Sequence, residues 1–241
     1  MVEEKKVETG AIVPAEVKEE TALDRWQPKT ELGKKVFSGE IDDINKILDS
    51  GQRITEPEIV DKLVPNLKNE LVLIGGRKGK GGGVQRIPVK ITATMHKSGR
   101  RFKTSSFVVI GNEEGLVGVG RGSAVEAKDA IAKAIQRAKT KIIKVKRGCG
   151  SWECGCDEQH SVKFKTTGKS GSVKVVLMPA PKGVGLATDP EARKILKLAG
   201  VKDIWIKTFG NTSMRVNLIT AVYNALKNLY IYDKTEKEKV E

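Results

Sequence analysis

Residues 89–122 have the sequence VKITATMHKSGRRFKTSSFVVIGNEEGLVGVGRG, and this stretch decides the fold. Apolar and polar side chains alternate from Val89 to Met95, which is the period of a strand with one buried face. Turn-forming residues at 98–99 and 111–115 interrupt the apolar pattern. The stretch therefore predicts three antiparallel strands, over residues 89–95, 101–110 and 116–119.

A helix is expected directly after these strands. Ser123 and Glu126 have the spacing of a capping box, in which a hydroxyl and a carboxylate bond free backbone amides at a helix start. A buried stripe follows at helical spacing, formed by Ile131, Ala134, Ile135, Ala138 and Ile142. The glycines at 118, 120 and 122 indicate a strand packed close to a neighbouring backbone. The resulting β-β-β-α unit is an open antiparallel sheet with a helix on one face.

A second unit is expected after the cysteine-rich segment. Strands are predicted over residues 162–166, 173–178 and 203–209. Asp189 and Pro190 are typical of a helix start, and Gly200 is typical of a helix end. Thr212 or Ser213 is expected to cap a last helix. The order β-β-α-β-α completes an α+β protein of two domains.

The positive charge is concentrated in one part of the chain. The 241 residues carry 44 Lys and Arg against 30 Asp and Glu, a formal net charge of +14. Residues 71–148 alone hold 18 basic and 4 acidic side chains, whereas residues 1–70 hold 11 and 16. A merely solvated surface would mix the two signs. A field of nearly one sign predicts a polyanionic partner, for which RNA or DNA is the usual candidate.

The candidate contacts with nucleic acid are the cations of this basic segment. At the hairpin around Ser98 and Gly99 they flank one aromatic ring, Phe102, which we expect in the core. The candidates are Arg77, Lys78 and Lys80 in the glycine-rich stretch, Lys97, Arg100, Arg101 and Lys103 at the hairpin, Arg121 after the third strand, and Lys133, Arg137 and Lys141 on the helix.

Three cysteines and a histidine lie within twelve residues, with the spacing C-x4-C-x-C-x3-H. They are Cys149, Cys154, Cys156 and His160. Zinc binds three thiolates and an imidazole tetrahedrally, and a closed set of four protein ligands is structural rather than catalytic. We therefore predict one structural zinc ion, with Trp152 packed over the site. The alternative is three incidental thiols and a surface histidine, which the missing apolar context of the thiols disfavours.

Features of a catalytic or nucleotide-binding site are scarce. Lys163 occupies the position where a phosphate-binding loop ending at residues 168–170 needs its first glycine, and Ser123 replaces the third glycine of a dinucleotide loop. Neither His96 nor His160 lies near a Ser nucleophile with a supporting carboxylate in sequence. We therefore expect no enzyme. The chain has no apolar run long enough for a membrane span and begins with charged residues, so an intracellular, reducing compartment is expected.

The chain divides into segments by composition and period. Nine residues from Gly75 to Gly83 hold six glycines and three cations, which favours a flexible loop over a regular element. We predict an acidic flexible leader at 1–24, short helices at 25–70, a glycine-rich basic loop at 71–84, an RNA-binding-like domain at 85–147, a zinc-binding linker at 148–161, a C-terminal α+β domain at 162–232 and a charged tail at 233–241.

These residues resemble a known family, the universal small-subunit ribosomal protein number five. The resemblance rests on SGRRF at 98–102, FVVIGN at 107–112 and GLVGVG at 115–120. In the second unit it rests on VLMPAPKGVG at 176–185 and LAGVKD at 198–203. The cysteine cluster and the long leader are similar to the archaeal branch of this family.

The resemblance implies an N-terminal domain like a double-stranded-RNA-binding fold and a left-handed β-α-β crossover in the second domain. It also implies a structural constituent of the cytoplasmic small ribosomal subunit, which binds small-subunit ribosomal RNA and the neighbouring ribosomal proteins numbers four and eight. Members lie beside the channel through which mRNA enters and support decoding accuracy. Lys97, Arg100, Arg101 and Lys103 would then face RNA.

Two other functions remain open at this point. One is an RNA-binding factor with the same fold outside the ribosome. The acidic leader and the basic loop disfavour it, because such segments are typical of chains that fold only within an assembly. The other is a zinc-dependent RNA-modifying enzyme. A closed set of four ligands disfavours that reading, because it leaves no position for water on the metal.

Overall fold

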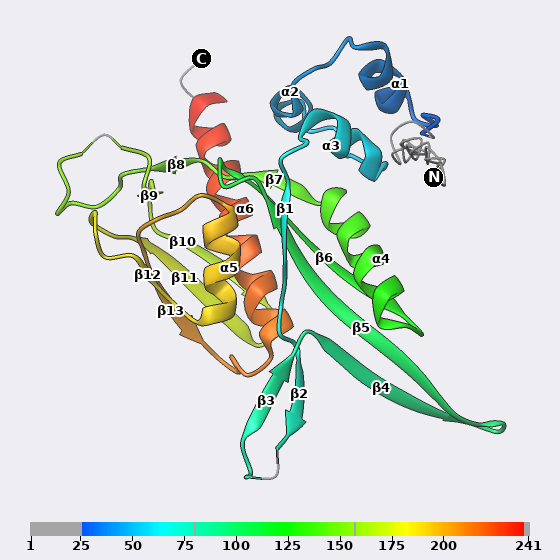
Figure 1. The fold of residues 1–241 in the computed structure, drawn as a ribbon. Helices are drawn as coiled ribbons and strands as arrows, with labels where there is room; N and C mark the ends of the chain where they lie inside the picture. The colour runs from blue at the N-terminus through cyan, green and yellow to red at the C-terminus, as the bar shows by residue number, and fades with distance from the viewer. Residues whose placement is uncertain (1–25, 80, 157, 239–241) are drawn as a thin grey trace, which may run out of the picture.

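The computed structural model describes residues 26–79, 81–156 and 158–238 (Figure 1). The leader expected at 1–24 and Lys80 lie outside the described residues. Three short helices come first, as expected for this part of the chain: α1 (Glu31–Ser38), α2 (Ile44–Asp49) and α3 (Pro57–Leu63). The Thr30 hydroxyl caps α1 by accepting a hydrogen bond from the Gly33 amide at 3.0 Å.

A five-stranded antiparallel sheet forms the first unit. Its strands are β1 (Lys68–Leu71), β4 (Val89–His96), β5 (Gly99–Gly111), β6 (Leu116–Ala124) and β7 (Ile142–Lys144). β5 is central: β6 pairs along one edge, and β1 and β4 share the other. The three predicted strands correspond to β4, β5 and β6. β1 and β7 were not predicted, because strands of four and three residues show no clear period.

Helix α4 (Ala127–Lys139) packs against β6 and differs at both ends from the prediction. The capping box is wrong: Ser123 still belongs to β6 and pairs with Ser105, so the sheet uses the backbone that a helix start would need. Ile142 lies in β7 and not on the helix. The prediction of close packing is confirmed, since a Cβ at Gly120 would overlap the carbonyl oxygen of Ala134 in α4.

The glycine-rich stretch is partly regular, so the prediction of a loop over 71–84 is wrong. β2 (Gly75–Lys78) pairs antiparallel with β3 (Val84–Ile87), and the two project from the body as a hairpin (Figure 1). The ladder of backbone hydrogen bonds with 84–87 compensates for the entropy that the glycines lose. Composition alone does not reveal this partner.

The second unit is a four-stranded sheet with the order β10-β11-β13-β12. Its strands are β10 (Thr166–Ser170), β11 (Val173–Pro179), β12 (Leu186–Ala187) and β13 (Ile204–Phe209). β12 and β13 run parallel and α5 (Pro190–Leu198) connects them, which is the expected β-α-β crossover, although its hand stays a prediction. α6 (Arg215–Glu238) packs on β10 and β11.

The element boundaries of this unit match the sequence at α5 and differ elsewhere. The Asp189 carboxylate caps α5 at the Glu191 amide, at 3.1 Å, as expected. The strand expected over 162–166 is two pieces: β9 (Ser161–Val162) pairs with β8 (Arg147–Gly148), and β10 begins only at Thr166. α6 begins one or two residues later than a cap at Thr212 or Ser213 predicts, because the Asn211 side chain forms a turn with the Ser213 amide.

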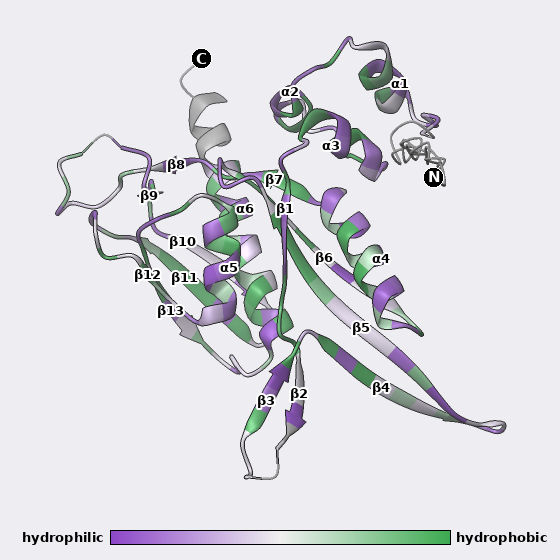
Figure 2. Ribbon diagram, viewed as in Figure 1, coloured by the Kyte–Doolittle hydropathy of each residue, from purple (hydrophilic) through white to green (hydrophobic). Residues whose placement is uncertain are grey.

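The two units share a hydrophobic core, because β5 is buried on both faces. Phe107 and Val109 pack in one cluster with residues of α5 and α6. Val108 and Ile110 pack in another, with α4 and the three N-terminal helices. Figure 2 shows β5 hydrophobic where it crosses the body and hydrophilic towards its free end. Within the described residues, none of the helices has the length and apolar composition that a membrane span requires.

Candidate nucleic-acid interface and metal centre

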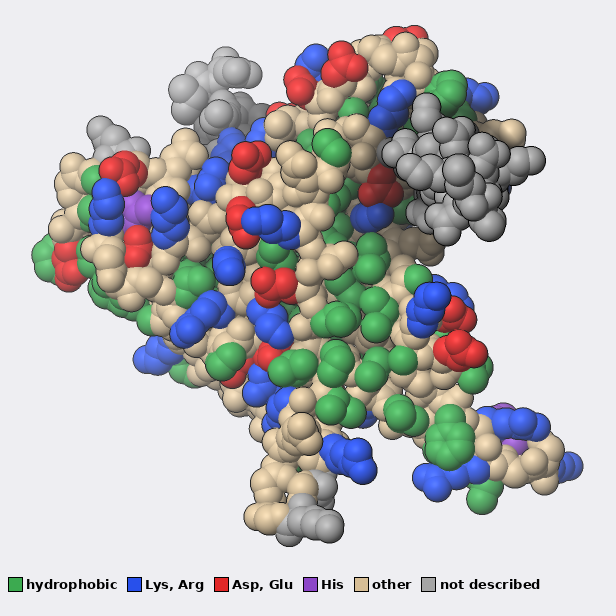
Figure 3. Space-filling view, in the orientation of Figure 1, with side chains coloured by type: hydrophobic (Ala, Val, Ile, Leu, Met, Phe, Trp, Pro, Cys, Tyr) green, Lys and Arg blue, Asp and Glu red, His purple; other side chains and the backbone are tan. Residues whose placement is uncertain are grey.

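β4 and the first half of β5 leave the body as a two-stranded ribbon, which comprises residues 89–106 (Figure 1). Its register pairs His96 with Gly99 at the tip and Val89 with Ser106 at the base. Every residue from 90 to 103 except Gly99 is exposed. The projecting end, at the lower right of Figure 3, presents Lys and Arg side chains around hydrophobic ones. The ribbon therefore offers both faces to a partner.

Phe102 lies on this ribbon and is 55% exposed, so the prediction that it belongs to the core is wrong. The alternation of the sequence is real, but the ribbon extends past the elements that could cover its apolar face. Ile91 and Met95 are exposed for the same reason. The Arg100 guanidinium stacks over the Phe102 ring, 5.3 Å from its centroid.

A cationic hollow of about 580 Å³ lies at the base of the ribbon. Six cations line it: Arg53, Lys90, Lys103, Arg121, Arg137 and Lys141. Its other lining residues are Ser and Thr, and none of the described Asp or Glu side chains reaches it. Arg137 donates a hydrogen bond from Nη1 to the Arg121 carbonyl oxygen at 2.8 Å, which joins α4 to β6. Cations and hydroxyl groups of this kind suit the phosphates and sugars of a nucleic acid.

A second hollow of about 450 Å³ lies between the ribbon and the start of α4. Arg101, Lys103 and Lys133 line it together with Phe102 and a single carboxylate, that of Asp129. Lys103 thus belongs to both hollows. The structure places six of the predicted cations around these two adjoining surfaces.

The remaining predicted cations lie apart from the hollows. Lys97 and Arg100 are exposed at the ribbon tip, and Arg77 is exposed on the β2–β3 hairpin. Lys78 lies on the same hairpin as Arg77, at the end of β2. Sequence reasoning missed Arg53 and Lys90. Lys90 was visible as a polar residue in the alternation of β4, whereas nothing near Arg53 in the sequence indicates its approach to the sheet.

The acidic N-terminal helices neutralise part of the basic unit. Lys139 of α4 pairs with Asp61 at 2.6 Å, and Lys144 of β7 pairs with Asp49 at 3.3 Å. The Tyr230 hydroxyl donates to the Asp49 carboxylate at 2.7 Å, and this hydrogen bond holds the pKa of Asp49 below its usual value. Lys139 and Lys144 are therefore occupied within the chain, in contrast to the lysines of the cationic hollow.

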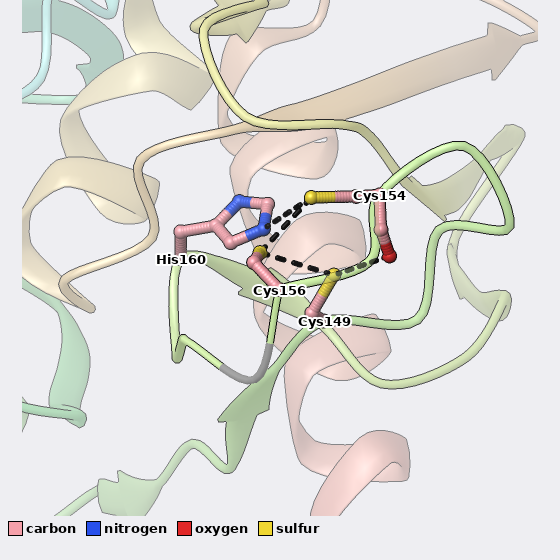
Figure 4. Close-up of side chains that lie close together, drawn as sticks. All are labelled: Cys149, Cys154, Cys156 and His160. Carbon is pink, nitrogen blue, oxygen red and sulfur yellow. Dashed lines mark hydrogen bonds between the residues drawn. The ribbon is translucent and has the colours of Figure 1, made fainter.

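The cysteine loop, residues 149–160, forms a separate candidate site (Figure 4). The pairing of β8 with β9 closes its two ends. The backbone of residue 150 runs so close to the segment after β9 that a Cβ at Gly150 would overlap the Lys163 carbonyl oxygen. This closure brings the four predicted ligand atoms within 4.8 Å of one another.

Two distances between the four candidate ligand atoms match a tetrahedral zinc ion, and a third is shorter. Zinc–sulfur bonds of about 2.3 Å place the sulfurs of a tetrahedral site ~3.8 Å apart. The Cys149 and Cys156 sulfurs are 3.7 Å apart, and the Cys154 sulfur is 3.8 Å from His160 Nε2. The Cys154 and Cys156 sulfurs are closer, at 2.9 Å. Their hydrogen bond lowers the pKa of Cys154 to about 6 and raises the pKa of Cys156 to about 11.

The surroundings of the cysteine loop differ from the expectation in one respect. His160 is 3% exposed, as a fixed ligand should be. Trp152 is 91% exposed and does not pack over the site, so that prediction is wrong. The loop is tied instead to the second unit: the His160 carbonyl oxygen accepts hydrogen bonds from the amides of Lys202 and Asp203.

Comparisons with known proteins cover both units. The family model described as "Ribosomal protein S5, N-terminal domain" matches residues 84–146, and "Ribosomal protein S5, C-terminal domain" matches residues 168–239. The first match contains the ribbon and most of the cationic hollow. The cysteine loop lies between the two matches.

Relatives match most of the chain. A protein named small ribosomal subunit protein uS5 from Methanocaldococcus jannaschii is 48% identical over 217 residues, which cover 90% of this chain and 93% of the relative. The protein of the same name from Pyrobaculum arsenaticum is 47% identical over 210 residues, 87% of this chain and 96% of the relative. That from Nanoarchaeum equitans is 45% identical over 207 residues, 86% of this chain and 89% of the relative.

Proposed function

Because the chain belongs to the ribosomal protein S5 family, in its archaeal form, we propose that it binds small-subunit ribosomal RNA through the ribbon and the cationic hollow. The family is a structural component of the small ribosomal subunit and not an enzyme, so the RNA-modifying enzyme is excluded. The place of action that follows is the cytoplasmic small ribosomal subunit.

The observation that carries the RNA contact is the cationic hollow. Six cations converge there from the segment between α2 and α3, the sheet, α4 and the turn after α4, although Arg53 and Lys141 are 88 positions apart. Their charges repel one another, which is unfavourable unless a polyanion binds. The β4-β5-β6-α4 order of this unit supports the proposal of a domain like the double-stranded-RNA-binding fold. In this proposal Lys97, Arg100 and the β2–β3 hairpin with Arg77 and Lys78 extend the RNA contact away from the body.

Three finer parts of the proposal rest on the family resemblance alone. They are a position beside the channel through which mRNA enters, a contribution to decoding accuracy, and contacts with ribosomal proteins numbers four and eight. The alternative of a free RNA-binding factor has no observation in its favour.

We also propose that Cys149, Cys154, Cys156 and His160 hold one structural zinc ion. The support is the donor set and its spacing, together with the burial of His160. Bound zinc would stabilise the cysteine loop, which has few apolar contacts of its own. Zinc would then fix the conformation of the segment at 148–161, which connects the two domains.

The RNA proposal is tested by co-sedimentation. Archaeal small subunits depleted of their own copy are mixed with the chain and centrifuged through a high-salt gradient. We expect the unmodified chain to migrate with the subunits. A variant with Arg121, Arg137 and Lys141 changed to Ala should be largely lost from them, because high salt weakens the remaining phosphate contacts.

The matched control removes three exposed lysines of the second unit, Lys174, Lys207 and Lys227, and thus the same charge. It should bind nearly as well as the unmodified chain. Equal loss in both variants would contradict a specific role of the cationic hollow. An unmodified chain that stays at the top of the gradient would favour the free RNA-binding factor.

A further inference from the structure

His160 is bonded on both sides of its ring. Nε2 faces the Cys154 sulfur at 3.8 Å, and Nδ1 lies 3.0 Å from the Asp203 carboxylate oxygen Oδ2. Both residues are buried, at 3% and 5% exposure. The ring therefore has one nitrogen towards the sulfurs and the other towards a carboxylate, 43 residues further along the chain.

Asp203 uses its second oxygen as well. Oδ1 accepts hydrogen bonds from the amides of Gly183 at 3.1 Å and Gly185 at 2.7 Å. These amides belong to the loop at 180–185, which leads into β12 and then α5. One carboxylate thus joins the histidine of the cysteine loop to a loop of the second unit.

The chemistry of these contacts requires a carboxylate. Two amide N–H groups and the His160 Nδ1 atom point at Asp203, and because an ionised carboxylate accepts hydrogen bonds only, Nδ1 is assigned the proton of its contact. An Nδ1–H donated to Asp203 leaves Nε2 as the nitrogen with a free electron pair, directed at the three sulfurs. Such a partner fixes the tautomer and orientation of a metal-bound histidine and raises its basicity as a ligand.

We propose that Asp203 is a positioning residue of the metal site, which presents His160 Nε2 to the metal and transmits metal binding to the loop at 180–185. This inference rests on the proposed zinc site. In this proposal the metal stabilises more than the cysteine loop, because Asp203 also links it to the loop that leads into β12 and α5.

Substitution of Asp203 by Asn tests the inference because the amide is nearly the same size. An Asn has one acceptor oxygen and one donor NH₂ group, so it cannot face both the histidine Nδ1–H and the two glycine amides as an acceptor. Either the His160 tautomer or the glycine contacts must be lost. The loss of such a partner typically weakens metal affinity by about 10–100-fold.

The experiment titrates the full chain with zinc against a competing chelator. We expect the affinity of Asp203→Asn to fall by about 10–100-fold. Long-range ¹⁵N NMR of the zinc-loaded chain should show His160 metal-bound through Nε2 with a proton on Nδ1, and a changed Nδ1 signal in the variant. The matched control is Asp189→Asn, at the cap of α5, where Asn caps a helix equally well and affinity should not change.

A second measurement needs no substitution. Hydrogen exchange of the Gly183 and Gly185 amides in the unmodified chain should slow when zinc is bound. Equal zinc affinity in Asp203→Asn and the unmodified chain, or exchange that zinc does not affect, would overturn the role of Asp203 and leave the zinc site intact. An unmodified chain that binds no zinc would overturn both.

Discussion

The ribbon and the cysteine loop are both short polar segments that extend from the packed sheets and helices. They differ in the exposure of their side chains and in their hydrogen bonds to the rest of the chain. The ribbon is exposed on both faces, and its side chains make few contacts, such as that from Arg101 to Ser98 at 3.1 Å. The cysteine loop ends in a buried histidine that is hydrogen-bonded to the second unit through its ring and its carbonyl oxygen. This contrast agrees with the two proposals: the ribbon presents exposed charges to a large partner, whereas the cysteine loop presents its donor atoms from a buried, hydrogen-bonded histidine.

This difference predicts that substitutions in the ribbon and in the cysteine loop have different effects. In the proposed RNA contact the charges of the ribbon should act additively, so each lost cation should weaken RNA binding by a similar step. The four proposed zinc ligands should act as one unit, because a tetrahedral site with one ligand missing is no longer closed.

The largest effect should follow from opening the metal site. Cys154→Ser, or treatment of the unmodified chain with a chelator, should abolish the proposed zinc binding and with it the local folding to which metal binding is linked. Without the ion the loop should become accessible to a protease that cleaves after Glu, at Glu153 and Glu158. Mass spectrometry of the fragments identifies the cleavage sites, and circular dichroism should show that most helix and strand remain.

Trypsin cleavage of the ribbon at Arg100 and Arg101 provides the internal control. The ribbon is exposed with or without metal, so this cleavage should not change on chelation. If chelation accelerated both cleavages equally, the two regions would not be independent, and the comparison would be wrong.

The next effect concerns RNA. Changing Arg100 and Arg101 together to Ala should weaken binding to small-subunit ribosomal RNA and flatten its salt dependence, by about 0.7–0.9 in the log–log slope for each lost phosphate contact. Zinc content should stay the same. A Lys174→Ala, Lys207→Ala double variant removes equal charge from the second unit and should leave the slope nearly unchanged. A slope unaffected by the ribbon variant would show that the tip does not touch phosphate.

The sequence predicted these two regions unequally well. The four residues that cluster in the cysteine loop are close in sequence and chemically distinctive, so the sequence could group them. Asp203 could not, because a lone aspartate 43 positions from His160 carries no local signal. Of the cationic hollow, the sequence named Lys103, Arg121, Arg137 and Lys141, whereas Arg53 comes from a distant segment between α2 and α3.

The fold shows the same contrast between features set by local sequence patterns and features that depend on residues far away in the sequence. The long alternating strands and the helix start at Asp189 are local patterns, and the structure contains them. The errors at Ser123, Phe102 and the glycine-rich stretch arise where pairing or exposure depends on a partner elsewhere. Ser123 continues a ladder with Ser105, and Phe102 extends beyond the elements that could bury it.

The segment before α1 is held by hydrogen bonds to one carboxylate, that of Glu56. The Glu56 carboxylate accepts hydrogen bonds from Trp26 Nε1 at 2.9 Å, the Lys29 amide at 3.0 Å and the Thr30 amide at 2.7 Å. Burial alone would raise the pKa of Glu56, but the hydrogen bonds, led by that of Thr30, outweigh it and lower the pKa below the ordinary 4.5. Glu56 thus fixes the start of α1.

Glu56→Gln should destabilise this start by about 1 kcal/mol, since Gln offers one acceptor oxygen to three donors. Because the folded pKa is depressed, the contribution is complete above pH 4.5 and is lost as the pH falls through the folded pKa. The measurement is Trp fluorescence during unfolding at pH 7 and at acid pH, with Glu58→Gln in the first turn of α3 as control. A variant as stable as the control at pH 7 would contradict the role of Glu56.

The smallest effect should come from the exposed edge of the cysteine loop. Lys182 and Glu158 form an ion pair at 2.8 Å, but their side chains are 59% and 62% exposed. Water screens such a pair, and holding two long side chains together costs entropy, so exposed pairs contribute little. Each residue still shifts the pKa of the other, because their hydrogen bond lowers the pKa of Glu158 and raises the pKa of Lys182.

Lys182→Ala should therefore leave both the melting temperature and the zinc affinity unchanged within error, although it removes a cation near Cys154 and Cys156. The comparison with Asp203→Asn is informative because both side chains join the cysteine loop to the loop at 180–185, one in water and one buried. If only the buried contact contributes to metal binding, the Asp203 variant should lower zinc affinity and the Lys182 variant should not. A larger loss in Lys182→Ala would mean that long-range charge rather than the fixed histidine governs the metal site.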